Sequence, residues 1–289
     1  MKFSVFGGDM RQAKLAEFLA ADGHDTSAFA LDKLRVIDGV RQCGTAKEAA
    51  EGADVCVLPL PAASREGMLT TPLSSGLHTV REILSALSPG QTIFAGRLDA
   101  QTAEVAGAMG LSVGDYFLRE ELAVSNAVAA VEGAIKIMIE ETPVTLWRSG
   151  CLIIGFGRIG KLLAHRLRAL GMRVTATARK CSDLAWIRAY GYEAVETAAV
   201  GSVVGDYDFI VNTVPSRVLG ASRLPNIRRD ALLLDLASKP GGIDFAAAAK
   251  LGVHAVWALS LPGEVAPVTS GAVIRDTLYN IMREKGLPL

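Results

Sequence analysis

The sequence lacks the charge imbalance that is typical of proteins that bind nucleic acid or membrane surfaces. Its 289 residues contain 30 Lys and Arg and 30 Asp and Glu, so the formal net charge is zero. Without a net positive field, neither nucleic acid nor an anionic membrane is favoured as a partner. The chain must therefore recognise its partners at local sites.

Metal-binding and disulfide patterns are also missing. The four cysteines form no C-x-x-C pair, and the four histidines have no spacing that suits zinc. Cys56 and Cys151 fall in apolar strand patterns, so we expect reduced thiols, no disulfide and no metal. No histidine follows a nucleophile or base pattern, although His78 lies in a loop near Ser74-Ser75-Gly76.

Targeting and membrane-spanning patterns are absent as well. Residues 1–8 resemble a strand and turn, without the basic start, apolar stretch and cleavage site of a signal peptide. No uninterrupted apolar run approaches the length needed to cross a bilayer. These absences predict a cytoplasmic protein with no membrane partner.

Half of the residues are hydrophobic and 29 are glycine, a composition that suits buried parallel strands. The predicted fold is α/β, with two doubly wound Rossmann-like domains that contain parallel sheets, joined by a long interdomain helix and a C-terminal helix. We expect an N-terminal substrate domain over 1–118, completed by the C-terminal helix 267–289. The interdomain helix is expected over 119–143 and the dinucleotide-binding domain over 144–266.

The most informative stretch is 151–160, which reads C-L-I-I-G-F-G-R-I-G. A short apolar strand that runs into G-x-G-x-x-G and then into a helical pattern is typical of the first turn of a dinucleotide-binding unit. In this turn Gly155 allows the tight bend, Gly157 lets the backbone approach a pyrophosphate, and Gly160 lets the helix lie against the strand. The alternative is a glycine-rich turn that binds nothing.

The end of the next predicted strand, 173–177, indicates which nicotinamide cofactor fits. NAD-specific domains usually have a carboxylate there, whereas NADP-specific domains have a cation for the 2'-phosphate. This chain has Arg179 and Lys180, with Ser182 close by, and Asp183 falls later, where we expect it to cap the next helix. NADP is therefore the predicted cofactor, with NAD as the alternative.

Further strands are predicted over 192–195, 207–214, 231–236 and 253–259, and ligands of such sheets lie beyond the carboxyl ends of the strands. The loops after the strands 207–214 and 231–236 are therefore candidate cofactor contacts. The predicted cofactor-binding residues are Gly155, Phe156, Gly157, Arg158, Ile159, Gly160, Arg179, Lys180, Ser182, Asn212, Thr213, Val214, Pro215, Ala237 and Ser238.

The first half contains predicted strands at 2–6, 54–60, 92–95 and 111–113. The first of them runs into Gly7-Gly8-Asp9-Met10-Arg11-Gln12, a turn without the third glycine, where Arg11 could hold a carboxylate with its two-pronged guanidinium. Helical spacing continues from Arg119 to Glu141, and Glu132 is one of the polar residues that interrupt its apolar surface. A last helix, from Pro267, is expected to pack back on the first domain.

Several motifs in this order resemble the family of dipicolinate synthase A subunits, over nearly the whole chain. The most specific are G-G-D-x-R-Q at 7–12 and D-L-A-S-K-P-G-G at 235–242; further ones are 124–126, 131–134, 155–160, 212–215 and 261–267. The resemblance implies oxidation of dihydrodipicolinate to dipicolinate with a nicotinamide cofactor in the mother cell of a sporulating bacterium. It also implies a flavoprotein-like B subunit of dipicolinate synthase as partner, and we expect a homo-oligomer.

Such a reaction needs a hydride acceptor, cations for two carboxylates and a proton acceptor. The predicted cations are Arg11, Arg119 and Lys239, and the proton acceptor is either Glu132 or Asp9, with a small dicarboxylate held between the domains. Two alternatives stay open. One is a 2-hydroxy-acid or amino-acid dehydrogenase of the same layout, although the expected arginine and histidine are absent from its usual places. The other is a noncatalytic NADP-binding protein that regulates a partner enzyme.

Overall fold

The computed structural model describes residues 1–64 and 67–288. The chain folds into two compact units, one of residues 1–126 with 262–289 and one of residues 127–261. The long helix that the sequence predicts is α5 (Glu120–Glu140), and the boundary between the units falls inside it. The expected separate segment 119–143 is thus shared between the units, and the first unit begins again at Pro262 rather than at Pro267.

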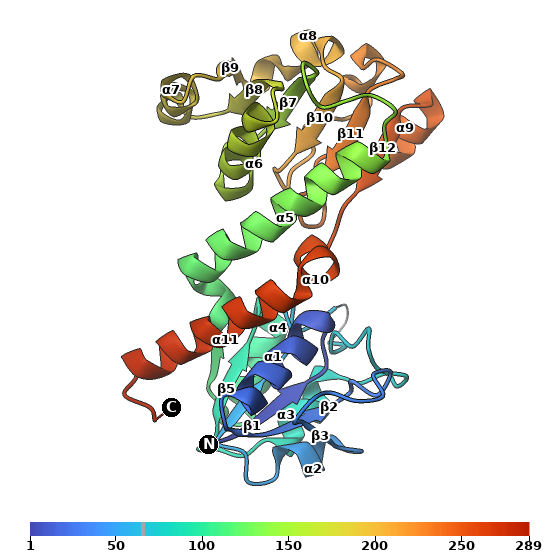
Figure 1. Ribbon diagram of the computed structural model, residues 1–289. Coiled ribbons are helices and arrows are strands. Elements are labelled where there is room, and N and C mark those ends of the chain that lie inside the picture. The colour runs from blue at the N-terminus through green and yellow to red at the C-terminus, as the bar shows by residue number, and fades with distance from the viewer. Residues whose placement is uncertain (65–66, 289) are drawn as a thin grey trace. The chain divides into compact units, whose positions relative to one another are not determined.

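Unit 1 contains a six-stranded parallel sheet with strand order β3-β2-β1-β4-β5-β6 (Figure 1). The strands are β1 (Lys2–Phe6), β2 (Asp25–Phe29), β3 (Arg41–Gln42), β4 (Val55–Val57), β5 (Thr92–Ala95) and β6 (Val113–Asp115). The helices are α1 (Met10–Ala21), α2 (Ala46–Ala50), α3 (Val80–Ala86), α4 (Ala100–Ala108) and α11 (Pro267–Glu284), with the 3-10 turn η1 (Tyr116–Leu118). The short α10 (Leu261–Val265) precedes α11.

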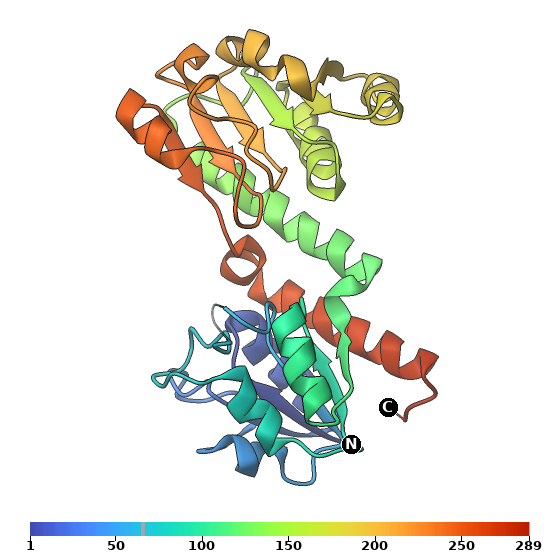
Figure 2. The ribbon, with the colours of Figure 1, turned by 180° about the vertical axis from the view of Figure 1, so that it is seen from behind.

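Helices cover both faces of the unit 1 sheet, as expected for a doubly wound fold. One face carries α1 and α11, whose Leu15, Leu19, Ile274 and Leu278 pack with Phe3 and Val5 of β1. The other face carries α2, α3 and α4. Figures 1 and 2 show α11 beside α1, and a Cβ on Gly271 would lie 2.9 Å from the Arg11 carbonyl oxygen. The C-terminal helix therefore returns to the unit formed by the first residues, as predicted.

The sequence patterns did not indicate β2 and β3. In β2, Thr26 and Ser27 are buried although they are polar, because hydroxyl groups find partners inside the unit. The Ser27 and Ser4 hydroxyls lie 2.8 Å apart, and Ser27 Oγ donates to the Ala49 carbonyl at 3.2 Å. Since Thr26 and Ser27 are buried beside only two apolar residues, Ala28 and Phe29, β2 does not produce the apolar pattern that predicts strands.

Unit 2 contains a second six-stranded parallel sheet, with order β12-β11-β10-β7-β8-β9. The strands are β7 (Gly150–Ile154), β8 (Arg173–Ala178), β9 (Glu193–Glu196), β10 (Phe209–Asn212), β11 (Leu232–Asp235) and β12 (His254–Trp257). The helices are α6 (Arg158–Ala169), α7 (Cys181–Ala189), α8 (Val200–Val203) and α9 (Phe245–Leu251), with 3-10 turns η2 (Thr197–Ala199), η3 (Val204–Asp206) and η4 (Leu224–Asn226). One face of this sheet packs against α5, α6 and α7, and the other against α8 and α9. The predicted pair of Rossmann-like α/β domains is confirmed.

Helix α5 has 21 residues and is long and apolar enough, by length and composition, to cross a membrane. Its apolar run is not uninterrupted, since Glu132 and Lys136 lie within it, as the sequence analysis expected. The helix instead contributes core residues: Val131, Ala134 and Met138 are fully buried against α6 and β7. An apolar helix of a protein core passes the same length test as a membrane span.

Candidate functional site

The strand order of unit 2 reverses between β7 and β10, and the loops after these two strands contain Gly155 and Thr213. In open α/β sheets, ligands bind at such a switch point beyond the carboxyl ends of the strands. Thr213 is tied to β7, since its backbone amide and its hydroxyl both donate to the Ile154 carbonyl at 2.9 Å. The glycine turn therefore lies at the place in the sheet where a ligand is expected.

The three glycines of this turn have three different surroundings. Gly155 has φ +100°, and a Cβ there would lie 2.6 Å from Thr213 Oγ1. A Cβ on Gly160 would lie 2.2 Å from the Gly155 carbonyl oxygen, so α6 packs directly on the turn. A Cβ on Gly157 would meet no atom within 4 Å among the described residues. Gly155 and Gly160 are required for folding, whereas Gly157 leaves open space beside the backbone.

The open space at Gly157 lies at the start of α6. Gly157 is the N-cap residue and has no side chain with which to cap the helix, which begins at Arg158. The first turn of α6 therefore receives no side-chain cap from its N-cap residue. Backbone amides at the positive end of a helix dipole are what an anion such as a pyrophosphate needs. The turn fits a dinucleotide by its own geometry.

Two exposed cations follow β8 next to this turn. The Gly155 amide donates to the Thr177 carbonyl at 3.2 Å, and Arg179 and Lys180 come two and three residues later. Neither cation forms an ion pair within residues 1–64 and 67–288. Ser182, also exposed, lies in the first turn of α7. Lys180, not Asp183, is the N-cap of α7, so the expected capping role of Asp183 was wrong.

Asn212 and Asp235 form a buried network beyond the ends of β10 and β11. Asn212 Nδ2 donates to Asp235 Oδ1 at 2.7 Å and to the Val214 carbonyl at 3.0 Å, and its Oδ1 accepts from the Val214 amide at 3.2 Å. Both side chains are fully buried. The Asn212 amide therefore shapes the 213–215 loop, and the structure does not leave it free to contact a ligand.

The same network folds the loop 236–241. The Asp235 carboxylate accepts from the amides of Ala237, Gly242 and Ile243 at 3.0, 2.7 and 3.2 Å. A Cβ on Gly242 would lie 2.3 Å from Asn212 Nδ2, which requires a glycine there. Ala237 is buried, Ser238 is partly exposed and Lys239 is exposed at the end of the loop. The first and last residues of the motif D-L-A-S-K-P-G-G, Asp235 and Gly242, are thus needed to fold the loop, and Lys239 is exposed to solvent.

The candidate site of unit 1 lies between β1 and β4, where the order of that sheet reverses. Asp9 is the N-cap of α1, and its carboxylate accepts from Arg11 Nε at 3.0 Å and from Arg11 Nη2 at 2.8 Å. Arg11 Nη2 also donates to the Leu60 carbonyl at 2.7 Å. Arg11 is only 4% exposed, and the carboxylate that its guanidinium holds in the structure is that of Asp9. Only Nη1 has no hydrogen bond within the described part of the chain.

The structure does not bring Arg119 beside Arg11. Arg119 Nη2 donates to Glu284 Oε1 at 2.7 Å, and its Nε donates to Glu121 at 2.8 Å. Gly271 lies against Arg11, and α11 rises by about 20 Å from Gly271 to Glu284 at about 1.5 Å per residue. These ion pairs raise the pKa of Arg119 and lower that of Glu284. Arg119 thus links the end of η1 to the end of α11 through its ion pair with Glu284.

Glu132, the other predicted carboxylate, belongs to unit 2. It lies 3.7 Å from Arg166 of α6, and the two side chains are 55% and 41% exposed. An exposed pair of this kind is an ordinary surface ion pair. Nothing in its surroundings distinguishes Glu132 as a base.

Sequence reasoning missed the residues that enclose Asp9 and Arg11. A Cβ on Gly263 would lie 2.6 Å from Asp9 Oδ2 and 3.1 Å from Arg11 Nε. Buried Gln12 donates to the Tyr116 hydroxyl at 3.3 Å, and Tyr116 donates to the Leu58 carbonyl at 3.1 Å. Burial raises the pKa of Tyr116. The available signals were the L-P-G motif at 261–263 and the glutamine of G-G-D-x-R-Q.

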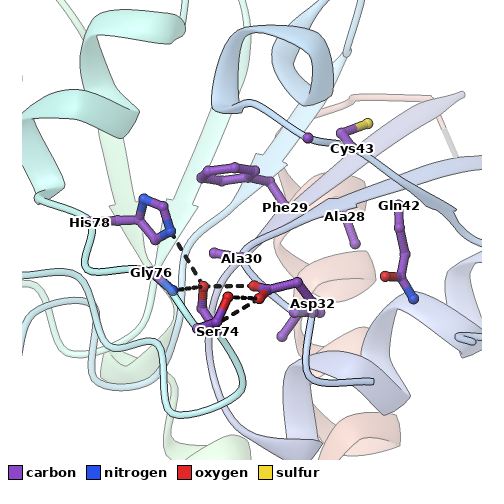
Figure 3. A pocket seen from close by; sticks show the side chains of 12 residues that line it. Ala28, Phe29, Ala30, Asp32, Gln42, Cys43, Ser74, Gly76 and His78 are labelled. Carbon is purple, nitrogen blue, oxygen red and sulfur yellow. Dashed lines mark hydrogen bonds between the residues drawn. The ribbon is translucent and has the colours of Figure 1, made fainter. Parts of the chain in front are cut away.

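A cavity of about 270 Å³ lies beyond the end of β2, in unit 1. Figure 3 shows Ser74 between Asp32 and His78: its hydroxyl donates to Asp32 Oδ1 at 2.7 Å and lies 3.3 Å from His78 Nε2. Hydrogen bonds from Ser75 and Ser74 hold the pKa of Asp32 well below its usual range. Because the serine proton faces the carboxylate, His78 is not placed to remove it, as nucleophilic catalysis requires. This cluster fixes the loop and offers no activated nucleophile.

The cysteines and other potential metal ligands supply no further site. Cys56 and Cys151 are buried free thiols, and burial raises the pKa of Cys56 to about 12. Within residues 1–64 and 67–288, no three His, Cys, Asp or Glu side chains are grouped to hold a metal ion.

Two family models match this chain. The model of the N-terminal domain of the dipicolinate synthase A subunit matches residues 2–117. The model described as D-isomer specific 2-hydroxyacid dehydrogenase, NAD binding domain, matches residues 131–238, which include the glycine turn and the first residues of the loop after β11.

Similar proteins cover nearly the whole chain. The dipicolinate synthase A subunit of Bacillus subtilis is 32% identical over 286 residues, which are 98% of this chain and 96% of the relative. The crystal structure of that protein has a TM-score of 0.85 over the same shares. The corresponding A subunit of Bacillus halodurans is 27% identical with a TM-score of 0.87, over 97% of each chain. A transhydrogenase from Sinorhizobium meliloti, 19% identical with a TM-score of 0.73 over 98% of this chain and 94% of its own, shares the fold.

Proposed function

Because the chain belongs to the family of dipicolinate synthase A subunits, we propose that it oxidises dihydrodipicolinate to dipicolinate with NADP as hydride acceptor. The chain is a dehydrogenase-type subunit, and its unit 2 has the fold of a nicotinamide-dinucleotide-binding domain. The specific reaction and the choice of NADP are the proposed parts.

The observation that carries the proposal is the glycine turn 155–160. Gly155 and Gly160 pack too closely for any side chain, and Gly157 borders open space at an uncapped helix start. That arrangement suits a pyrophosphate bound by backbone amides. The bound nicotinamide would accept a hydride from the substrate.

The preference for NADP is argued from Arg179 and Lys180. They follow the second strand of the unit, where a carboxylate would accept from the ribose 2'-hydroxyl of NAD. Both are exposed and make no ion pair in the part of the chain that the structure describes, so they are free to contact a 2'-phosphate. A guanidinium suits phosphate oxygens through two parallel hydrogen bonds.

For the substrate, we assign the carboxylate contact in unit 1 to Arg11, whose Nη1 remains available, and the proton acceptor to Asp9. Asp9 holds the Arg11 fork in one orientation, and its side chain keeps 23% of its surface exposed. Lys239 is the proposed cation of unit 2, because it is exposed at the end of a rigidly folded loop. Arg119 and Glu132 are assigned structural ion pairs instead, since each already has a partner.

In this reaction the substrate loses a hydride and a proton, and its ring becomes aromatic. The product is already favoured by aromatic stabilisation, so the protein has to orient the substrate and accept the proton. We further propose that the chain works with the B subunit of the synthase, since the name of its relative implies a partner, and that it acts in the cytoplasm of a sporulating cell.

The test is a turnover assay with purified protein, dihydrodipicolinate and NADP, with and without the B subunit. The proposal expects NADPH and dipicolinate to form in equal amounts, and Arg11→Ala to raise the half-saturating substrate concentration. Arg119→Ala is the matched control, an arginine of the same unit with no assigned substrate contact. If neither preparation turned over, or if both variants behaved alike, the assignment of the reaction or of Arg11 would be rejected.

A further inference from the structure

Helices α6 and α7 expose a set of basic and aromatic side chains on unit 2. The set consists of Lys161, His165 and Arg168 on α6 with Trp186 on α7 and Tyr190 at the C-cap of α7, and we name it the α6–α7 face. Spacings of three and four residues place each group on one side of its helix. Trp186 is 55% exposed and Tyr190 is 51% exposed, which is unusual for large aromatic residues.

Direct contacts join the two helices into one surface. The Arg168 guanidinium donates to the carbonyls of Tyr190 and Gly191 at 2.8 and 2.9 Å, and it lies 5.5 Å from the centre of the Tyr192 ring. The rings of Trp186 and Tyr190 stack at 5.6 Å. These contacts hold the exposed aromatic rings in place, so a partner would lose little conformational entropy by binding them.

The charge of this region is one-sided, although the whole chain is neutral. In residues 144–196 the acidic residues are Asp183, Glu193 and Glu196. The basic residues are Arg148, Arg158, Lys161, Arg166, Arg168, Arg173, Arg179, Lys180 and Arg188. Neither Lys161 nor Arg168 forms an ion pair with a carboxylate within the described residues. The face therefore offers cations that no carboxylate of residues 1–64 and 67–288 neutralises.

We propose that the α6–α7 face docks an acidic surface of the B subunit of the synthase, a partner that rests on the proposed function. Exposed tryptophan, tyrosine and arginine are the residues that dominate binding energy in protein interfaces. Trp186 and Tyr190 supply the aromatic contact, and Lys161 and Arg168 select carboxylates. A symmetric contact between two copies would oppose like charges, which disfavours this face as a self-association surface.

The same face touches the glycine turn through Phe156. The Phe156 ring lies 6.2 Å from Tyr190, and Lys161 Nζ lies 5.8 Å from the centre of the Phe156 ring. Phe156 stands between Gly155 and Gly157. Docking on the face therefore reaches a residue of the proposed dinucleotide site, and binding of the partner and of the dinucleotide are expected to be coupled in both directions.

The experiment measures the affinity of the purified B subunit from the same organism for the full chain by isothermal titration. Trp186→Ala is expected to weaken the complex at least about tenfold. The control is Trp147→Ala, because Trp147 is 64% exposed but lies against Gly171 and Arg148, outside the face. Lys161→Glu is expected to weaken the complex, whereas Lys250→Glu, on exposed α9, leaves it unchanged.

Four results would overturn the proposal. The first is that no complex forms, and the second is that both tryptophan variants bind the B subunit equally. The third is that the face binds a single-stranded oligonucleotide more tightly than it binds the B subunit. The fourth is that Trp186→Ala dissociates a dimer of this chain in sedimentation. NADP titration of the same samples separates this proposal from the proposed function. Failure of the unmodified chain to bind NADP would contradict the proposed function. Trp186→Ala is expected to bind NADP as the unmodified chain does.

Discussion

A pair of glycine substitutions in the turn 155–160 should separate folding from ligand binding. At Gly157, φ is −82° and ψ is −159°, values that alanine adopts without strain, and the added methyl would meet no described atom within 4 Å. Gly157→Ala should therefore leave the free energy of unfolding unchanged or raise it by about 0.4–1 kcal/mol, because alanine has less freedom in the unfolded chain. The methyl would, however, fill the space that a pyrophosphate needs.

At Gly160, in contrast, an alanine is expected to lower the stability of the fold. The added methyl would lie 2.2 Å from the Gly155 carbonyl oxygen, a backbone atom that cannot move without displacing the turn. Overpacking of this kind costs about 1–3 kcal/mol or more, so Gly160→Ala should lower the melting temperature by roughly 2–12 °C.

The assay combines thermal unfolding with titration of NADP for both variants and for Gly107→Ala. Gly107 is an exposed residue of α4 in unit 1, and a Cβ there would meet no described atom within 4 Å, so this control should keep its affinity for NADP. Gly157→Ala should lose at least about tenfold in affinity, or 1.4 kcal/mol, without losing stability. If it bound NADP as the unmodified chain does, the pyrophosphate would not lie at this turn and the reasoning would fail.

Arg179→Ala should remove most of any preference for NADP over NAD, a loss of about 1.5–3 kcal/mol or roughly tenfold to a hundredfold, and unchanged dissociation constants for both cofactors would exclude its role. Asp235→Asn should destabilise unit 2 by about 1–3 kcal/mol, because an amide cannot accept from all of the Asn212, Ala237, Gly242 and Ile243 donors; a melting temperature equal to that of the unmodified chain would show that the network contributes nothing. Asp32→Asn should lower the melting temperature at neutral pH. The pKa of Asp32 is lowered from 3.8 in the folded chain, so its ionised form contributes stability above that value and loses it as pH falls through the lowered pKa. The difference between the two proteins should thus narrow in acid, and a constant difference would contradict this sign.

The unit 2 fold could be predicted because the residues that indicate it lie close together in the sequence. The strand, the glycines at fixed spacing and the following amphipathic helix lie close together in sequence, and each has a physical requirement that the structure displays at Gly155 and Gly160. Strands β10 and β11 are apolar runs buried in a parallel sheet, and β12 is a partly exposed strand at the edge of that sheet. All three could be predicted, although the predicted segments extend beyond the observed ends.

The partners of the polar side chains could not be predicted in the same way. Asp235 and Asn212 are 23 residues apart in sequence, and only the parallel pairing of β10 with β11 makes them neighbours. Arg11 was predicted to hold a substrate carboxylate, and the N-cap geometry of Asp9 turns a carboxylate of the chain itself onto the guanidinium. Arg119 forms an ion pair with Glu284, which is 165 residues away in sequence. Such pairings depend on tertiary contacts that spacing does not encode.

The central claim is that unit 2 binds a nicotinamide dinucleotide, with NADP preferred. Isothermal titration of the unmodified protein with NADP and with NAD tests it most directly. We expect one site per chain and an affinity for NADP roughly tenfold to a hundredfold tighter than that for NAD, as one two-pronged contact to the 2'-phosphate would give. Binding of neither dinucleotide would contradict the claim itself, and equal affinity for both would contradict the role of Arg179 and Lys180.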